Sequence, residues 1–267
     1  MPAPLELVLI AAIGLAGGVA GGLLGLGGSV VMIPLLTFAL GPDQQLYQAA
    51  CLVVNIPVGI VATVRHRRGG SIRGDLVRAM VPLAAIGAVL GVFLSNALDG
   101  KRLLVAFGSF LLYTALAEAV GLVRAKGDHP PAERVSGSRL RPIAAVTGLS
   151  SGLLGIGGGT LLMPLLRGIA KLPLRQAVGT SSAVTIVAAS VAAVAKNATL
   201  SGLVRTDGSP LTLPATLGLA AALIPTAVAG GFLGAALVYR LPVASVRVVF
   251  LVLIGLSGIR MVGLGLG

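Results

Sequence analysis

The sequence predicts an all-helical protein that crosses a membrane several times and consists of two related halves. Of its 267 residues, 56% are hydrophobic and only 10% are charged, whereas a soluble domain carries about 25% charged residues. Several apolar runs reach the ~18 residues of a transmembrane helix candidate. A glycine-rich motif near the N-terminus also returns 130 residues further along the chain.

The repeated motif is an apolar segment that clustered glycines interrupt and a proline follows. The two copies are GLLGLGGSVVMIPLL at 22–36 and GLLGIGGGTLLMPLL at 152–166, with nine of the fifteen positions identical. As one straight helix, the first apolar stretch from Leu5 to Leu40 would be ~50 Å long. The hydrocarbon core is only ~30 Å thick. We therefore expect the segment to break at its glycines, and its second copy to do the same.

Each half is expected to hold one broken segment followed by three membrane spans. In the first half the turns and loops are at 41–45, 65–78 and 99–102, and the spans are at 47–64, 79–97 and 103–123. In the second half the broken segment is 142–166, the loops and turns are at 167–175, 196–210 and 239–242, and the spans are at 177–195, 212–238 and 246–264. This defines a first repeat at 1–123, a polar cytoplasmic linker at 124–141 and a second repeat at 142–267.

The duplication extends beyond the glycine motif. Gln48-Ala49 aligns with Gln176-Ala177 at an offset of 128, and Pro82 and Gly91 align with Pro225 and Gly234 at an offset of 143. Internal repeats that frame a site near the bilayer midplane are typical of secondary transporters.

Two arrangements of the repeats are compatible with the sequence. If each broken segment is a re-entrant hairpin, the repeats are inverted; if it crosses the membrane, they are parallel. With the 65–78 loop in the cytoplasm, the hairpin arrangement places 15 of the 20 Lys and Arg inside, and the parallel one places 13. Cytoplasmic loops carry an excess of these residues, so the count favours hairpins and inverted repeats.

The breaks are the candidate substrate site. The half-helix that follows each break presents unpaired N–H groups and the positive end of its dipole, which suits an anion. Polar residues early in the spans at 47–64 and 177–195 are further candidates, for lining a pathway or for bonding between helices. The alternative for the glycines is close helix packing alone. The candidate residues are Gly25, Gly27, Gly28, Ser29, Asn55, Gly155, Gly157, Gly158, Gly159, Thr160, Gln176, Thr180, Ser181 and Ser182.

Other chemistries lack the residues that they need. The expected spans contain no histidine, no paired carboxylates and no metal-ligand cluster, so we expect no enzyme activity, cofactor or metal. The net charge of +12 does not indicate nucleic acid, because Trp is absent and aromatic residues are 3%, leaving few surfaces for base stacking. Cys51 is expected to be a buried small hydrophobe. Arg65 and Lys196 end corresponding spans, where anchoring at the membrane interface is the expected role and attraction of anions to a vestibule is the alternative.

The paired motifs that close in Pro34 and Pro164, together with the sequence QAVGTSS at 176–182, resemble the TauE/SafE family over nearly the whole chain. Its members are bacterial inner-membrane sulfite and sulfonate exporters or permeases. The resemblance implies a multi-pass protein of the bacterial inner membrane whose partners are the lipid bilayer and a small anionic substrate.

The sequence therefore predicts a secondary transporter that exports a small anion, such as sulfite or an organosulfonate, by alternating access around a midplane site. The first copy has Ser29 at the position where the second has Gly159, so the site is expected to be asymmetric. A channel-like anion pore and an intramembrane hydrolase are the alternatives. A homodimer is compatible with the sequence.

Overall fold

The computed structural model describes residues 4–24, 27–123, 135–237 and 243–267, and these ranges form ten α-helices. The helices are α1 (Pro4–Leu24), α2 (Ser29–Leu40), α3 (Gln44–Arg68), α4 (Gly74–Asn96), α5 (Gly100–Val123), α6 (Gly137–Leu154), α7 (Gly159–Gly168), α8 (Leu174–Ala198), α9 (Leu213–Leu237) and α10 (Val243–Leu266). The described ranges contain no β-strand beyond a single bridge between Val204 and Pro210.

Seven of these helices are long and apolar enough to cross a membrane: α1, α3, α4, α5, α8, α9 and α10. The prediction of an all-helical, multi-pass protein is therefore confirmed. The six spans expected from the sequence lie in α3, α4, α5, α8, α9 and α10, and the expected helix breaks separate α1 from α2 and α6 from α7.

The polar connections are shorter than the sequence indicates. The arginine-rich segment expected as a loop at 65–78 is mostly helical, because α3 continues to Arg68 and α4 begins at Gly74. Basic side chains are favourable in the last turn of a helix, where they face the negative end of its dipole, and their long stems reach the aqueous interface from there. The run of arginines therefore did not mark the end of the helix. In the same way α6 begins at Gly137, within the expected linker, while residues 124–134 and the whole 239–242 turn lie outside the described ranges.

Two pairs of helices are in backbone contact through glycines. α1 packs along α9 and α6 packs along α4, each pair running parallel. A Cβ atom at Gly18 would lie 2.0 Å from the carbonyl oxygen of Ala227, and one at Gly148 would lie 2.0 Å from that of Ala84. Only glycine allows such an approach, and small residues are what bring helices together in lipid, where apolar burial supplies no net driving force.

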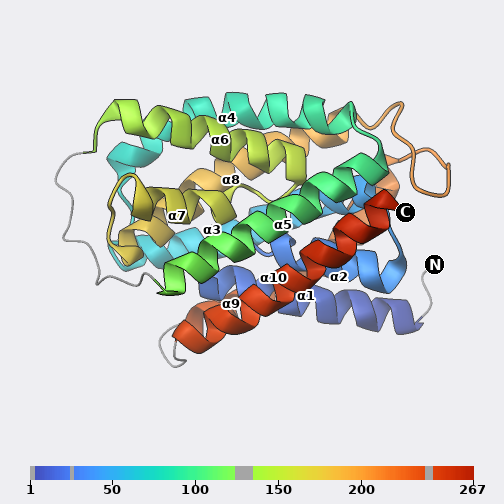
Figure 1. The fold of residues 1–267 in the computed structure, drawn as a ribbon, viewed down its shortest axis with the longest axis horizontal. Helices are drawn as coiled ribbons and strands as arrows, with labels where there is room; N and C mark the ends of the chain where they lie inside the picture. Colours follow the sequence, from blue (N-terminus) through green and yellow to red (C-terminus); the bar gives the residue numbers. More distant parts are fainter. Residues whose placement is uncertain (1–3, 25–26, 124–134, 238–242) are drawn as a thin grey trace.

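The chain reverses its direction at both glycine breaks. Gly17 in α1 faces the carbonyl oxygen of Gly28 and the side chain of Met32 in α2, so α2 runs back along α1. In the second half, Gly158 lies equally close to Thr147 of α6. In Figure 1 α1 begins and α2 ends on the right, whereas α6 begins and α7 ends on the left. The pairs α1/α2 and α6/α7 therefore open toward opposite ends of the molecule.

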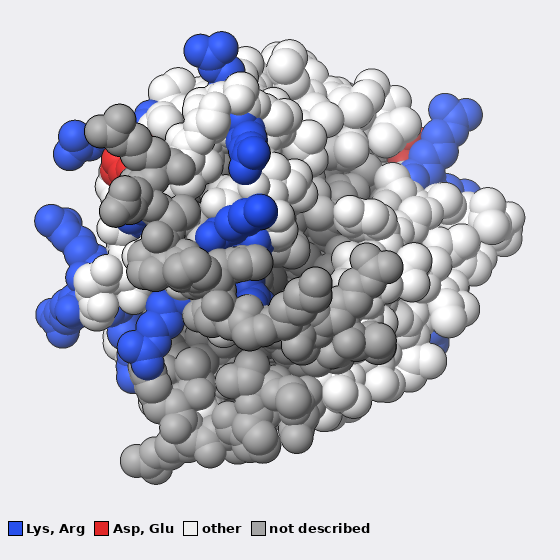
Figure 2. All heavy atoms as spheres, turned by 60° about the vertical axis from the view of Figure 1, so that its left-hand side comes forward, with Lys and Arg blue, Asp and Glu red and all other residues white. Residues whose placement is uncertain are grey.

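One end of the molecule is strongly basic. Figure 2 turns the left-hand end of Figure 1 toward the viewer and shows Lys and Arg side chains gathered there. The end of α3, the starts of α6 and α8 and the turn before α8 supply the exposed Arg67, Arg68, Arg139, Arg141, Lys171 and Arg175.

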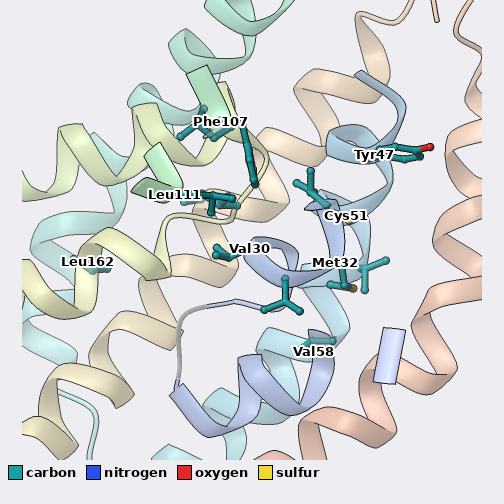
Figure 3. Close-up of a cluster of buried hydrophobic side chains, with 14 of the residues drawn as sticks. Val30, Met32, Tyr47, Cys51, Val58, Phe107, Leu111 and Leu162 are labelled. Atoms are coloured by element: carbon teal, nitrogen blue, oxygen red, sulfur yellow. The ribbon is translucent and has the colours of Figure 1, made fainter. Parts of the chain in front are cut away.

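The short helix α2 is enclosed in the apolar core. Its Val30 and Met32 are fully buried, as is Cys51 of α3. Figure 3 shows these side chains in one cluster with Val58 of α3 and with Phe107 and Leu111 of α5. This packing fixes where α2 begins, and hence where the first break lies. The burial of Cys51 confirms its expected role as a small hydrophobe.

Candidate functional site

The two glycine breaks meet each other beside the middle of α3. Gly27 of the first break has a φ of 83°, and a Cβ atom there would lie 3.0 Å from the carbonyl oxygen of Ile156 in the second break. Gly157, with a φ of 73°, would place a Cβ atom 3.2 Å from Asn55 Nδ2. Both glycines adopt the left-handed region that other residues avoid. Two segments 130 residues apart thus form one interior site with α3.

Asn55 is the central polar side chain of this site. It is 3% exposed, and its Nδ2 donates a hydrogen bond of 2.7 Å to Oγ of Ser29, the first residue of α2. Its Oδ1 has no hydrogen-bond partner among the described residues. A buried polar atom left unpaired costs about 1–3 kcal/mol, so this side of the amide is suited to a ligand or an ordered water. Rotation of the amide exchanges Oδ1 and Nδ2, which lets Asn55 offer either an acceptor or a donor.

Thr185 of α8 reaches the same place from the opposite side. Its methyl carbon lies 3.2 Å from the Cβ position of Gly157. Its Oγ1 is buried without a hydrogen-bond partner in the part of the chain that the structure describes. Asn55 and Thr185 each follow the first residue of their helix by eleven positions, so each half contributes one polar side chain at the same distance along its helix, although the offset of 128 pairs Asn55 with Ala183 in the sequence.

The start of each half-helix adds backbone donors to the site. α2 begins at Ser29 and α7 at Gly159, and each follows a glycine, Gly28 or Gly158, that has no side chain to cap the first N–H groups. The carbonyl oxygens of Gly28 and Gly158 accept hydrogen bonds from the N–H groups of Val31 and Leu161. The N–H groups before these have no carbonyl of their own helix to bond to, and the dipole makes this end positive. Ser181 Oγ donates to the carbonyl oxygen of Gly159 at 3.5 Å, which ties α8 to the start of α7.

Other described glycines of the motif pack closely against α1, α3 and α6. Gly155 lies against the Gln48 side chain of α3, Gly28 against Gly17 of α1, and Gly158 against Thr147 of α6. Thr160 is buried in the first turn of α7. Gly25 lies outside the described residues.

The polar side chains of residues 176–182, at the start of α8, do not all lie at the glycine breaks as the sequence predicted. Thr180 Oγ1 accepts a hydrogen bond of 3.1 Å from the backbone N–H of Arg73, in the loop between α3 and α4. Ser182 donates to the carbonyl oxygen of Val178 within its own helix. Gln176 is partly buried in the first turn of α8, with its Oε1 unpaired among the described residues. Ser181, by contrast, bonds to the first residue of α7.

Several buried polar residues were not singled out by the sequence as site residues. Among them are Thr185, Gln48 and Lys196, each 7% exposed or less. For Lys196 the expected anchoring at the membrane interface is wrong, because the side chain is completely buried and bonded to other helices. An anchor needs an ammonium group that reaches water. No local pattern distinguishes Lys196 from such an anchor, since its partners lie about 100 residues or more away in the chain.

Interrupted helices that meet at a buried polar site, within a chain of seven apolar helices of membrane-spanning length, define a multi-pass membrane transporter. The chain belongs to the sulfite exporter TauE/SafE family, whose family model matches residues 10–261. The resemblance inferred from the glycine motifs is thereby confirmed.

Several curated relatives are named as probable membrane transporters. The chain is 25% identical to the probable membrane transporter protein YunE of Bacillus subtilis, over 97% of this chain and 98% of YunE. It is 32% identical to a probable membrane transporter protein of Xylella fastidiosa, over 65% of this chain and 68% of that protein. It is 26% identical to the probable membrane transporter protein MamO of Paramagnetospirillum magneticum, over 92% of this chain but only 42% of MamO. The chain thus spans less than half the length of MamO. No solved structure matches.

Proposed function

We propose that this protein is a secondary transporter that exports a small oxyanion, such as sulfite or an organosulfonate, across the bacterial inner membrane by alternating access. The observation that carries the proposal is the meeting of Gly27 and Gly157 beside Asn55, with Ser29 and Thr185 at the same place. This site combines two half-helix starts with amide and hydroxyl groups.

The chemistry of this site suits an oxyanion. Sulfite and sulfonate groups present several acceptor oxygens that share one negative charge, and helix N-termini supply N–H donors together with a positive potential. Ser29 and Thr185 add hydroxyl donors, and Asn55 adds an N–H when its amide is rotated. None of these groups carries a full charge, so an anion can be released as well as bound.

The repeats are proposed to be inverted, each with a re-entrant hairpin. Supporting this, α1 with α2 opens toward the right of Figure 1 and α6 with α7 toward the left. The pairs α1/α9 and α6/α4 form the same glycine contact twice, since Gly18 and Gly148 differ by the offset of the motif. The basic end of Figure 2 is the proposed cytoplasmic side.

The location of single cysteines tests this arrangement in the full chain. In a Cys51→Ala background, we expect Gly267→Cys to react with a membrane-impermeant maleimide in intact cells. Lys171→Cys should react only after the membrane is permeabilised, because it lies at the basic end. Lys101→Cys is outside in both arrangements and serves as the positive control. Parallel repeats would reverse the results for positions 267 and 171.

Purified protein in proteoliposomes tests the transport proposal. We expect saturable uptake of sulfite or sulfoacetate, and uptake of labelled anion that is accelerated by unlabelled anion on the opposite side. An open pore gives no such counterflow. Liposomes without protein and the inert cation choline are the controls. Uptake of choline with no uptake of any sulfur oxyanion would contradict the proposal, as would cleavage of the anion in place of transport.

A further inference from the structure

A second polar centre lies away from the glycine breaks, at the end of α8. The ammonium group of Lys196 is completely buried. Its Nζ donates to Ser95 Oγ at 2.9 Å and to Asn96 Oδ1 at 2.7 Å, both near the end of α4. It also donates to Gln45 Oε1 at the start of α3. Three helices from both halves of the chain thus converge on one cation.

The ammonium has no anionic partner in this centre. All three acceptors are neutral, and no carboxylate lies within 4 Å of Nζ among the described residues. Burying a charge without a counter-ion costs several kcal/mol. The ends of α4 and α8 offset part of this, because helix C-termini favour a cation. The remaining deficit is one negative charge, which a bound anion would supply.

A pocket of about 430 Å³ lies directly beyond this centre. Gln45 and Asn96 both line the pocket and bond to Lys196, so these two residues connect the ammonium to the pocket. On its other side the pocket is lined by the loop before α9. There Arg205 pairs with Asp43 at 2.6 Å, and the hydrogen bond that its guanidinium donates to this carboxylate raises the pKa of the guanidinium.

The centre also connects inward to the glycine breaks. Ser95 Oγ, which accepts from Lys196, donates to Gln48 Oε1 at 3.0 Å. The Gln48 side chain rests on Gly155 of the second break. Asn55 follows Gln48 by seven residues on α3, which is two helical turns or ~10 Å on the same face. Polar groups thus lead from the pocket as far as Gln48, two turns of α3 before Asn55.

We propose that Lys196 is the cation of a second anion site, which the transported anion occupies between the pocket and the glycine breaks. When the amides of Gln45 and Asn96 move aside, the anion pairs with the ammonium and then passes inward along Ser95 and Gln48. This inference rests on the proposed anion transport. The site lies at the end of the molecule opposite the basic end of Figure 2.

Transport kinetics in proteoliposomes test the role of the charge. For Lys196→Met we expect the KM for sulfoacetate to rise at least about tenfold, the size of effect seen when a buried charged partner is lost. Lys196→Arg keeps the charge and should retain transport with a smaller rise. Lys171→Met removes an exposed lysine at the opposite, basic end of the molecule and should change KM less than about twofold. An unchanged KM in a folded, transporting Lys196→Met protein overturns the inference and leaves the proposed function intact. A wild-type protein that moves no anion overturns both.

Chemical restoration of the charge keeps the test decisive if Lys196→Met folds poorly. In the Cys51→Ala background, Lys196→Cys provides the single thiol of the chain. Aminoethyl methanethiosulfonate joins an ammonium to this thiol through a mixed disulfide and releases methanesulfinate, whereas methyl methanethiosulfonate adds no charge. We expect only the first reagent to restore the low KM, and sulfoacetate to slow its reaction. Sulfite is avoided because it cleaves disulfides. Equal recovery with both reagents would mean that Lys196 only fills space.

Discussion

Replacement of Asn55 by leucine is expected to reduce anion transport at least about 100-fold, which corresponds to ~3 kcal/mol. Leucine has nearly the same size, so the change removes the amide and little else. The lost groups are the donor to Ser29 Oγ and the unpaired Oδ1 between the two breaks. The measurement is the initial rate of sulfoacetate uptake in proteoliposomes, with the melting temperature of the purified protein recorded in parallel.

A double variant separates this functional role from a structural one. Asn55→Leu alone leaves the buried Ser29 hydroxyl without its partner, which costs about 1–3 kcal/mol of stability. Adding Ser29→Ala removes that unpaired group, so the double variant should regain most of the stability while transport remains absent. Asn197→Leu is the matched control, because it removes an amide of α8 that bonds to Thr216. If transport recovers together with stability, Asn55 positions helices and does not contact the anion.

Gly158→Ala is expected to destabilise the protein more than a single methyl group added at any other described glycine of the breaks. Gly158 has a φ of 84°, a conformation that costs other residues about 1–2 kcal/mol. The new Cβ would also lie 2.7 Å from both the carbonyl oxygen and the methyl carbon of Thr147, and such overpacking costs about 1–3 kcal/mol. We expect a sum of ~2–5 kcal/mol, measured as a loss of folded protein and a lower melting temperature.

Gly208→Ala is the matched control for this prediction. Gly208 has a similar φ of 80° but nothing lies within 4 Å of its Cβ position. It therefore carries the backbone cost without the overlap. The difference between the two variants measures how tightly the second half-helix is held against α6. Equal effects would show that the break can shift to admit a methyl group, and that the start of α7 is not fixed.

The sequence by itself determined the elements of this protein. Apolar length predicted the membrane helices, and the glycines at positions 25–28 and 155–159 predicted where two segments stop and restart. These properties are local, because hydrophobic content and backbone freedom depend on neighbouring residues in the chain. Helix ends were less accurate, since Arg67 and Arg68 are polar enough for a loop and yet favourable in the last turn of α3.

Only the tertiary structure decided which polar residues share an environment. Asn55 reaches Ser29, Thr185 faces Gly157, and Thr180 instead pairs with the 69–73 loop. Lys196 shows the limit most clearly: its position at the end of an apolar run fits an interface anchor, yet three helices enclose it. The physical reason is that helix packing, including the glycine contacts of α1 with α9 and α4 with α6, joins segments far apart in the sequence. The burial and hydrogen-bond partners of a side chain follow from that packing and not from its neighbours along the chain.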